Sequence, residues 1–320
     1  MIDVLLPMLA TPGTHVPPGD DWRHEVKWDG VRALATIDGA VTLASRNGNR
    51  ITAAWPELVT APTGLADTVL DGEIIALNER GIPDFRVLAE RMHVRNTATV
   101  ARLAQRIPAT YMVFDVLRLR GEDLCGLPLE ERRRRLADLD LSTSGWQVPP
   151  EYDDGAMLLE ATRTQGLEGI VSKRIDSTYR PGERSHHWLK FAHRHRGTFV
   201  VGGWRPQTGS SDRLAAVLVG EVTPDGLRYR GRVGSGIGPK QSRSLTDALA
   251  PLGRVGSPFA DEVPRADAEG TFWVDPVVVI DVDTHGLGYE RLRQPSYQGM
   301  RSDVSVDDLA DDLADNPGGH

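Results

Sequence analysis

The sequence is poor in lysine, in cysteine and in long apolar runs, and each scarcity excludes a class of protein. A single cysteine, Cys125, excludes an intrachain disulfide framework and a cysteine-rich zinc module. No apolar run approaches the ~18 residues that span a membrane. The first residues lack a basic segment and are interrupted by Pro7, which argues against a signal peptide. We therefore expect a soluble, cytoplasmic protein with no membrane partner.

Lysine is much rarer than arginine, aspartate or glutamate in this chain. Of 37 basic side chains only four are lysines, so each of the four needs an explanation. They are Lys27, Lys173, Lys190 and Lys240.

The acidic excess is concentrated at one end of the chain. The sequence holds 45 acidic residues against 37 basic ones, a net charge of −8. Residues 303–320 contribute six aspartates and no base, so the rest of the chain has a net charge of only −2. Arginine-rich faces for nucleic acid remain compatible with that balance. For the tail we expect a short amphipathic helical turn, with Leu309 and Leu313 at i, i+4, in an otherwise solvated acidic end.

At 320 residues, the chain exceeds the ~250–300 residues of a single hydrophobic core, which predicts two domains. In the first part, short β-rich runs alternate with helical stretches without a regular βαβ period, which favours an α+β domain with antiparallel sheets. The expected strands span residues 31–38, 41–46, 68–77 and 109–119. The expected helices span residues 84–93, 128–139 and 153–165.

After the polar stretch at 193–198 the chain becomes almost purely β. The expected strands lie at 198–204, 214–222, 227–236 and 272–283, with one helix at 239–250. About five strands in about 110 residues suit a small barrel such as an OB-fold, with an SH3-like or other small barrel as the alternative. The expected organisation is an α+β domain at 1–195, an OB-fold domain at 196–302 and an acidic tail at 303–320.

Residues 25–32, which read EVKWDGVR, are the central chemical feature. One interpretation is structural: Asp29-Gly30 makes a turn and Lys27 is solvated. The other is catalytic, because a lysine amine can lose its proton and attack phosphorus, whereas arginine cannot be deprotonated in practice. In so arginine-rich a chain, a retained lysine is what a covalent nucleophile would look like.

Further motifs follow Lys27 in order along the chain. They are Ser45–Gly48, Leu70–Glu73, Tyr111–Leu117, Glu168–Lys173, Trp188–Lys190 and, in the second domain, residues 200–204 and 227–238. Together they resemble the motif series of the ATP-dependent DNA ligases, which belong to the covalent nucleotidyltransferase superfamily. The likeness covers essentially the whole chain and is strongest to the small bacterial ligases of end joining, the actinobacterial C-type ligase and the ligase module of the D-type enzyme.

The resemblance implies an adenylation domain followed by an OB-fold barrel, and a reaction in three steps. Lys27 attacks the α-phosphate of ATP and pyrophosphate leaves, so that AMP is held as a lysyl phosphoramidate. AMP then passes to the 5′-phosphate of nicked double-stranded DNA, and the adjacent 3′-hydroxyl displaces it. Each step is phosphoryl transfer, which depends on positioning and charge neutralisation.

Roles for the base and sugar of the nucleotide follow from the same resemblance. Glu25 would accept a hydrogen bond from the adenine amino group, and Phe114 would stack on the base, with Tyr111 as the alternative. Arg32 and Arg46 would bind phosphate or sugar, tasks that suit a planar, bidentate cation.

Roles for the phosphates and the metal are implied as well. Glu73 and Glu168 would contact ribose or hold Mg²⁺ (or Mn²⁺), and Lys190 would contact the α-phosphate. Lys173 would bind the cofactor or face DNA, with a solvated strand end as the alternative. In the second domain, Arg293 and Arg301 would orient the β,γ-phosphates, on a barrel hinged near 193–198. Lys240 is expected to be an ordinary surface residue.

Two positions depart from the family pattern. Ala192 stands where a second lysine usually follows the residue matching Lys190, and His193 or Arg194 would have to supply that charge. Val304 replaces a lysine that is common in the terminal motif. The histidines at 186, 187, 193 and 195 lack a nearby cysteine, which argues against zinc.

Three functions are therefore weighed. The first is a DNA ligase using ATP, a monomer without additional modules, aided by end-joining repair proteins. The second is an RNA ligase or a GTP-using capping-type nucleotidyltransferase, which retention of label from GTP alone would reveal. The third is an inactive OB-type DNA-binding protein, which would tolerate Lys27→Ala without loss of any activity.

Overall fold

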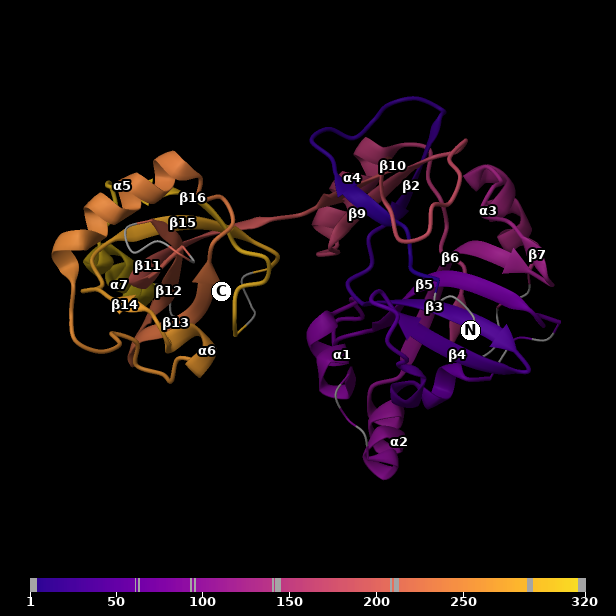
Figure 1. Ribbon diagram of the computed structural model, residues 1–320, viewed down its shortest axis with the longest axis horizontal. Helices are drawn as coiled ribbons and strands as arrows, with labels where there is room; N and C mark the ends of the chain where they lie inside the picture. Colours follow the sequence, from indigo (N-terminus) through magenta and orange to yellow (C-terminus); the bar gives the residue numbers. More distant parts are fainter. Residues whose placement is uncertain are drawn as a thin grey trace. The chain divides into compact units, whose positions relative to one another are not determined.

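The computed structural model describes residues 5–60, 62, 64–92, 94, 96–139, 141, 145–207, 209, 213–286 and 290–315. The chain divides into two compact units, Met1–His193 and Arg194–His320 (Figure 1). This division lies two residues before the boundary expected between the two domains. The second unit also includes the whole of the expected tail, residues 303–320.

The first unit contains a six-stranded sheet with the order β4-β3-β5-β6-β7, in which β8 pairs with β6. The strands are β3 (Val31–Asp38), β4 (Ala40–Ser45), β5 (Thr68–Ala76), β6 (Ala109–Leu119), β7 (Glu122–Asp123) and β8 (Trp146–Gln147). The four strands expected in this region are confirmed. Their pairing is antiparallel, apart from the parallel pair formed by β6 and β8.

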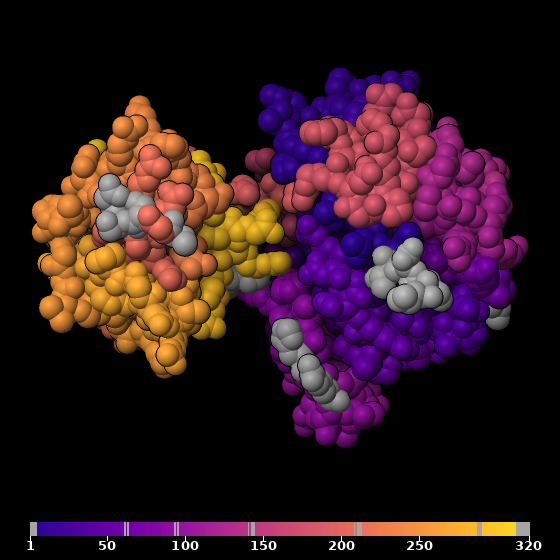
Figure 2. Space-filling model, in the orientation of Figure 1, coloured from indigo at the N-terminus to yellow at the C-terminus, as the bar shows by residue number. Residues whose placement is uncertain are grey.

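A second sheet of four strands has the order β1-β10-β9-β2. Its strands are β1 (Leu9–Pro12), β2 (Trp22–Val26), β9 (Gly169–Arg174) and β10 (Arg184–Ala192). Because β1 pairs with β10 in parallel, the start of the chain lies beside residues far along the sequence, as the indigo and salmon surfaces show (Figure 2). The sequence did not predict any of these four strands as a strand. β1 and β2 are short, and they gain their partners only through the tertiary fold.

Four helices complete this unit: α1 (Phe85–Met92), α2 (Thr97–Arg106), α3 (Leu129–Ala137) and α4 (Gly155–Thr164). Short 3-10 turns lie at Thr52–Ala54 and Pro56–Leu58. Three helices match the expected ones, and Gly166, with a φ of 71°, follows the end of α4 as expected. The prediction missed α2, although the Asn96 side chain accepts a hydrogen bond from the Thr99 amide as an N-cap.

Two hydrophobic layers hold the central sheet. One face packs on the large cluster that includes Trp55, Tyr111 and Trp146. Leu34 and Phe114 on the other face pack with Trp188 of the second sheet, together with Met8 and Tyr179. The two sheets therefore face each other across a common apolar cluster.

The second unit is a barrel of six strands with the order β13-β12-β11-β15-β16, in which β14 pairs with β11. The strands are β11 (His195–Pro206), β12 (Leu214–Thr223), β13 (Gly226–Val233), β14 (Phe272–Trp273), β15 (Val279–Thr284) and β16 (Ser296–Arg301). A bridge from Ser235, just after β13, to Ser296 of β16 joins the two edges of the sheet. The predicted α+β unit followed by an OB-type barrel is confirmed.

Three helices and a 3-10 turn accompany the barrel. They are α5 (Pro239–Leu249), the turn Ala250–Leu252, α6 (Arg265–Ala268) and α7 (Val306–Asp315). Leu245 and Leu249 of α5 enter the barrel core. The acidic helix α7 packs near β12, so residues 306–315 form more than the single turn expected. Among the residues described, no helix is long and apolar enough to cross a membrane.

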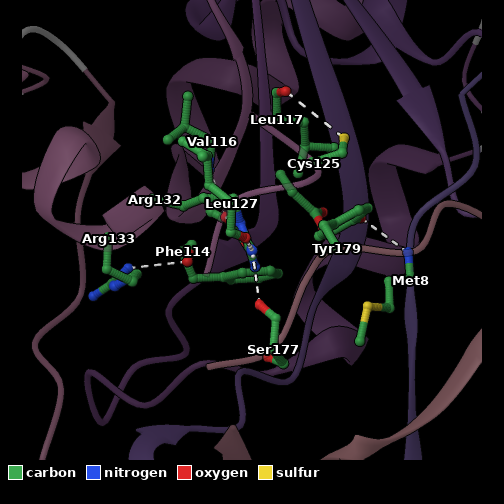
Figure 3. Close-up of polar contacts among 12 residues, drawn as sticks. Met8, Phe114, Val116, Leu117, Cys125, Leu127, Arg132, Arg133, Ser177 and Tyr179 are labelled. Atoms are coloured by element: carbon green, nitrogen blue, oxygen red, sulfur yellow. Dashed lines mark hydrogen bonds and ion pairs between the residues drawn. The ribbon is translucent and has the colours of Figure 1, made fainter. Parts of the chain in front are cut away.

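A buried ion pair attaches α3 to the central sheet. Arg132 and Asp115 are both fully buried, and the guanidinium donates to both carboxylate oxygens at 2.8 and 2.9 Å. The same guanidinium donates to the carbonyls of Leu127 and Ser177 at 2.6 and 3.0 Å (Figure 3). Both charges of this pair are therefore compensated by each other and by hydrogen bonds of good geometry.

Arg132→Ala should lower the free energy of unfolding by about 3–5 kcal/mol, because it leaves the Asp115 carboxylate buried without its cation. Urea denaturation of the full chain measures the change. Arg106→Ala is the matched control, since Arg106 pairs with Glu90 at the surface and should cost no more than about 1 kcal/mol. Equal losses in the two variants would contradict the expected role of the buried pair.

Candidate nucleotide-binding and catalytic site

The candidate site is formed by the facing surfaces of the two sheets in the first unit. Glu25 on β2 and Lys190 on β10 both lie opposite Val171 of β9, so these side chains share one face of the four-stranded sheet. Arg32 on β3 lies opposite Glu73 on β5, so these two share a face of the central sheet. Strand register alone thus collects residues from four separate motifs on two facing surfaces.

Lys27 follows directly after β2 and forms an ion pair with Glu168. Its Nζ lies 2.5 Å from Oε1 of Glu168, and both side chains are partly exposed. The backbone amide of Lys27 donates to the carbonyl of Gly169 at 2.8 Å, which continues the pairing of β2 with β9. The interpretation of Lys27 as a solvated turn residue is wrong, because the amine is held against a carboxylate by neighbouring strands.

The glycines beside these residues permit close backbone packing. A Cβ on Gly30 would lie 2.2 Å from the carbonyl oxygen of Ile74 on β5. Gly169 has a φ of 139°, and a Cβ there would lie 2.0 Å from the carbonyl oxygen of Phe191. Only glycine fits either position, so both glycines are needed to place Lys27 and Glu168 at their observed separation.

Lys190 lies half-buried on β10, close to other cations. Burial lowers the pKa of its amine, and the positive charges of Lys27, Arg184 and Arg46 lower it further, while Glu168 opposes the shift. Arg46 is exposed just beyond the end of β4. An anion entering this region would meet several positive charges.

Arg32 is held rigidly by a buried carboxylate. Its guanidinium donates to both oxygens of Asp71 at 2.6 and 2.7 Å, and Asp71 is fully buried. Asp71 also accepts a hydrogen bond from the hydroxyl of Tyr179 at 2.6 Å, and that hydroxyl accepts one from the amide of Met8 at 2.9 Å. The Arg32 side chain keeps 20% of its surface exposed, so part of it remains available to a ligand.

Phe114 lies at a β-bulge in β6. Asp71 pairs with Asp115 and Gly72 with Val113, so Phe114 is the additional residue between them. Such bulges re-aim a side chain, and here the ring lies 4.5 Å from the Arg32 guanidinium. The Phe114 carbonyl accepts a hydrogen bond from Arg133 of α3 at 3.1 Å (Figure 3). Tyr111, the alternative stacking residue, lies fully buried in the opposite core layer, which excludes it.

Glu25 and Lys173 form a second ion pair, deeper than the first. The Lys173 amine donates to both carboxylate oxygens at 2.8 and 2.7 Å, and both side chains are almost fully buried. Burial lowers the pKa of the Lys173 amine, and the Glu25 carboxylate opposes that shift. The alternative interpretation of Lys173 as a solvated strand end is therefore wrong.

Glu73 is the most perturbed carboxyl of the site. Burial raises the pKa of Glu73 to about 8, against the opposing charges of Arg32 and Lys27, and the nearby carboxyl of Glu168 raises it further. Within the described residues, no group of three or more histidine, cysteine or acidic side chains could hold a metal ion. Glu73 and Glu168 instead fit the pattern of Mg²⁺, which uses one or two carboxylates and completes its shell with phosphate and water.

The two arginines expected to act on the β,γ-phosphates belong to the second unit. Arg301 ends β16 and pairs with Asp303 at 2.7 Å and with Asp281 at 3.3 Å. The Arg293 carbonyl accepts hydrogen bonds from the Thr284 hydroxyl and the His285 amide. The nucleotide-binding roles of both residues stay predictions.

The replacement of a family lysine by Ala192 also has a structural setting. Ala192 is the last residue of β10 and lies opposite Gly169. The next residue, His193, engages Thr162 of α4 through its Nε2 at 2.9 Å, so its ring is directed to that helix.

The structure brings together the predicted residues of the first unit. They are Glu25, Lys27, Arg32, Arg46, Glu73, Phe114, Glu168, Lys173 and Lys190. No role was expected from the sequence for Asp71, Trp188 or Arg132. One signal was available: an acid within an apolar strand, such as Asp115, implies a buried cation elsewhere in the chain.

Comparisons with known proteins agree with this geometry. Residues 7–191 match the family model of the ATP dependent DNA ligase domain. Residues 210–304 match the model of the ATP dependent DNA ligase C terminal region.

Individual relatives of the chain are also DNA ligases. The chain is 38% identical to the multifunctional non-homologous end joining DNA repair protein LigD of Mycobacterium tuberculosis over 94% of its length, but it spans only 39% of that protein. It is 35% identical to DNA ligase C of the same organism, over 77% of this chain and 70% of that one.

A solved mycobacterial DNA ligase D complexed with ATP and MES shares 36% identity, with a TM-score of 0.57 over 95% of this chain and 97% of that one. Of the three functions weighed from the sequence, these matches favour the first. The chain belongs to the ATP-dependent DNA ligases, covalent nucleotidyltransferases that combine an adenylation domain with an OB-type domain.

Proposed function

We propose that Lys27 is the residue that carries AMP in this ligase and that the chain seals nicks between a 5′-phosphate and a 3′-hydroxyl in double-stranded DNA. The observation that carries the proposal is the Lys27 amine, held 2.5 Å from Glu168 beside Lys190 and Glu73. A nucleophile, a proton-accepting carboxylate and a second cation are the groups that attack on phosphorus requires.

In the first step the Lys27 nitrogen forms a bond to the α-phosphorus of ATP. The bond from that phosphorus to the bridging oxygen breaks, and pyrophosphate leaves with the electron pair. The amine must lose a proton on the way, and the Glu168 carboxylate lies within hydrogen-bond distance to receive it. Lys190 stabilises the negative charge that grows on the α-phosphate oxygens.

The nucleoside would lie against the facing sheets. Glu25 accepts a hydrogen bond from the adenine amino group, Phe114 stacks on the base, and Arg32 and Arg46 bind sugar or phosphate. The exposed part of Arg32 and the cationic surroundings of Lys190 support these assignments. When Mg²⁺ (or Mn²⁺) is bound, it neutralises phosphate charge, and Glu73 and Glu168 are the carboxylates that would hold it.

The cellular role is proposed from the relatives. LigD carries end joining and DNA repair in its name, and about two fifths of its length corresponds to this chain. We propose that this ligase acts as a monomer in cytoplasmic DNA repair and that its partners include nicked double-stranded DNA and end-joining repair proteins. Gel-shift titration with nicked and intact duplexes tests the DNA preference.

Lys27→Ala should abolish the covalent adenylate, and Lys27→Arg should do no better, because the position supplies a nucleophile rather than a charge. Intact mass after incubation with ATP and Mg²⁺ checks both variants against the wild type. Lys240→Ala, which removes an exposed lysine from α5, serves as the control and should gain one AMP. An AMP adduct on either Lys27 variant would refute the assignment.

Arg293→Ala and Arg301→Ala should slow self-adenylation at least about tenfold, because the β- and γ-phosphates are present only in the first step. Both variants should still seal a nick whose 5′-phosphate already carries AMP. Arg265→Ala removes an exposed arginine of α6 and is the matched control. Unchanged self-adenylation in both arginine variants would rule out their proposed role.

A further inference from the structure

We propose that Lys173 sets the base selectivity of the nucleotide site by keeping Glu25 a pure hydrogen-bond acceptor. The inference rests on the proposed function, in which Glu25 faces the exocyclic group of the purine. It assigns to Lys173 a specificity role in place of the contact with phosphate or DNA expected from the sequence.

The contacts of Lys173 are the first argument. Its amine spans both oxygens of Glu25 at 2.8 and 2.7 Å, and the two side chains keep only 2–3% of their surface exposed. The amine also lies 4.3 Å from the centre of the Phe114 ring and 4.4 Å from that of Trp188. The Lys173 amine therefore lies beside two aromatic rings, and Glu25 is the carboxylate that neutralises its charge.

The neighbouring charges are the second argument. Arg133 acts electrostatically on Glu25, but its guanidinium is bound to the carbonyls of Phe114 and Pro149 and paired with Glu151. Asp115 interacts electrostatically with Lys173, but its carboxylate forms an ion pair with Arg132. Lys173 is therefore the cation in direct contact with Glu25.

The chemistry of the carboxyl group gives the consequence. An ionised carboxylate can only accept hydrogen bonds, and each oxygen has capacity beyond one bond, so Glu25 can accept from a 6-amino purine while bound to Lys173. The same carboxylate repels the carbonyl of a 6-oxo purine. A buried carboxyl without a cation keeps its proton instead, and the resulting acid can donate to that carbonyl.

Lys173→Met tests this directly, because methionine fills the space between Phe114 and Trp188 without a charge. Self-nucleotidylation of the full chain is measured by intact mass with ATP and, separately, with inosine triphosphate, which carries a 6-oxo group where ATP carries the 6-amino group. The ratio of the ATP rate to the inosine triphosphate rate should fall at least about tenfold relative to wild type. Lys240→Met, an exposed lysine given the same substitution, should keep the wild-type ratio.

A second variant protects the test against a folding defect. Glu25→Gln combined with Lys173→Met leaves no unpaired charge in the interior, and its amide can either donate or accept. This double variant should use the two nucleotides at similar rates. The inference would be overturned if Lys173→Met kept the wild-type ratio of the ATP rate to the inosine triphosphate rate. If Lys173→Met does not fold, a wild-type ratio in the double variant would overturn it. Failure of wild type itself to form an adduct with ATP would instead refute the proposed function.

Discussion

The site depends on cations that are each matched to a buried carboxylate. Three such pairs surround Phe114: Arg32 with Asp71, Lys173 with Glu25, and Arg132 with the adjacent Asp115. Burying an unpaired charge would cost several kcal/mol, so these pairs form together with the packing of the two sheets or not at all. Because their geometry is fixed before any ligand arrives, the enzyme does not need to reorganise its charges when the nucleotide enters.

The Lys27 pair differs from these three because its carboxylate, Glu168, is partly exposed. Lys27 and Glu168 keep about a fifth of their side-chain surface open to solvent, whereas Lys173 and Glu25 keep almost none. The first pair is accessible to solvent, and the second is almost fully shielded from it. Two lysine–glutamate pairs thus connect the ends of the neighbouring strands β2 and β9, and we propose a role in chemistry for the first and in recognition for the second.

Much of the molecule follows from local sequence. The bounds of β3 and β6 were predicted to the residue, because an apolar, β-branched run bounded by turn residues is typical of a strand. The order of the motifs identified the ligase family and indicated the nine candidate site residues of the first unit before any geometry was known. By contrast, β1, β2, β9 and β10 were not predicted, since the four-stranded sheet joins segments that are distant in the chain. The helix α2 and the strand β16 were missed as well.

The sequence by itself determined the chemical groups: one lysine with a nucleophile's setting, carboxylates suited to a metal, and arginines suited to phosphate. Only the tertiary structure decided their pairing. Lys173 and Glu25 are separated by 148 positions, and β2 meets β9 only when the four-stranded sheet assembles. Burial and charge compensation are properties of that assembly, and no local pattern shows that Lys173 is buried while Lys27 is partly exposed.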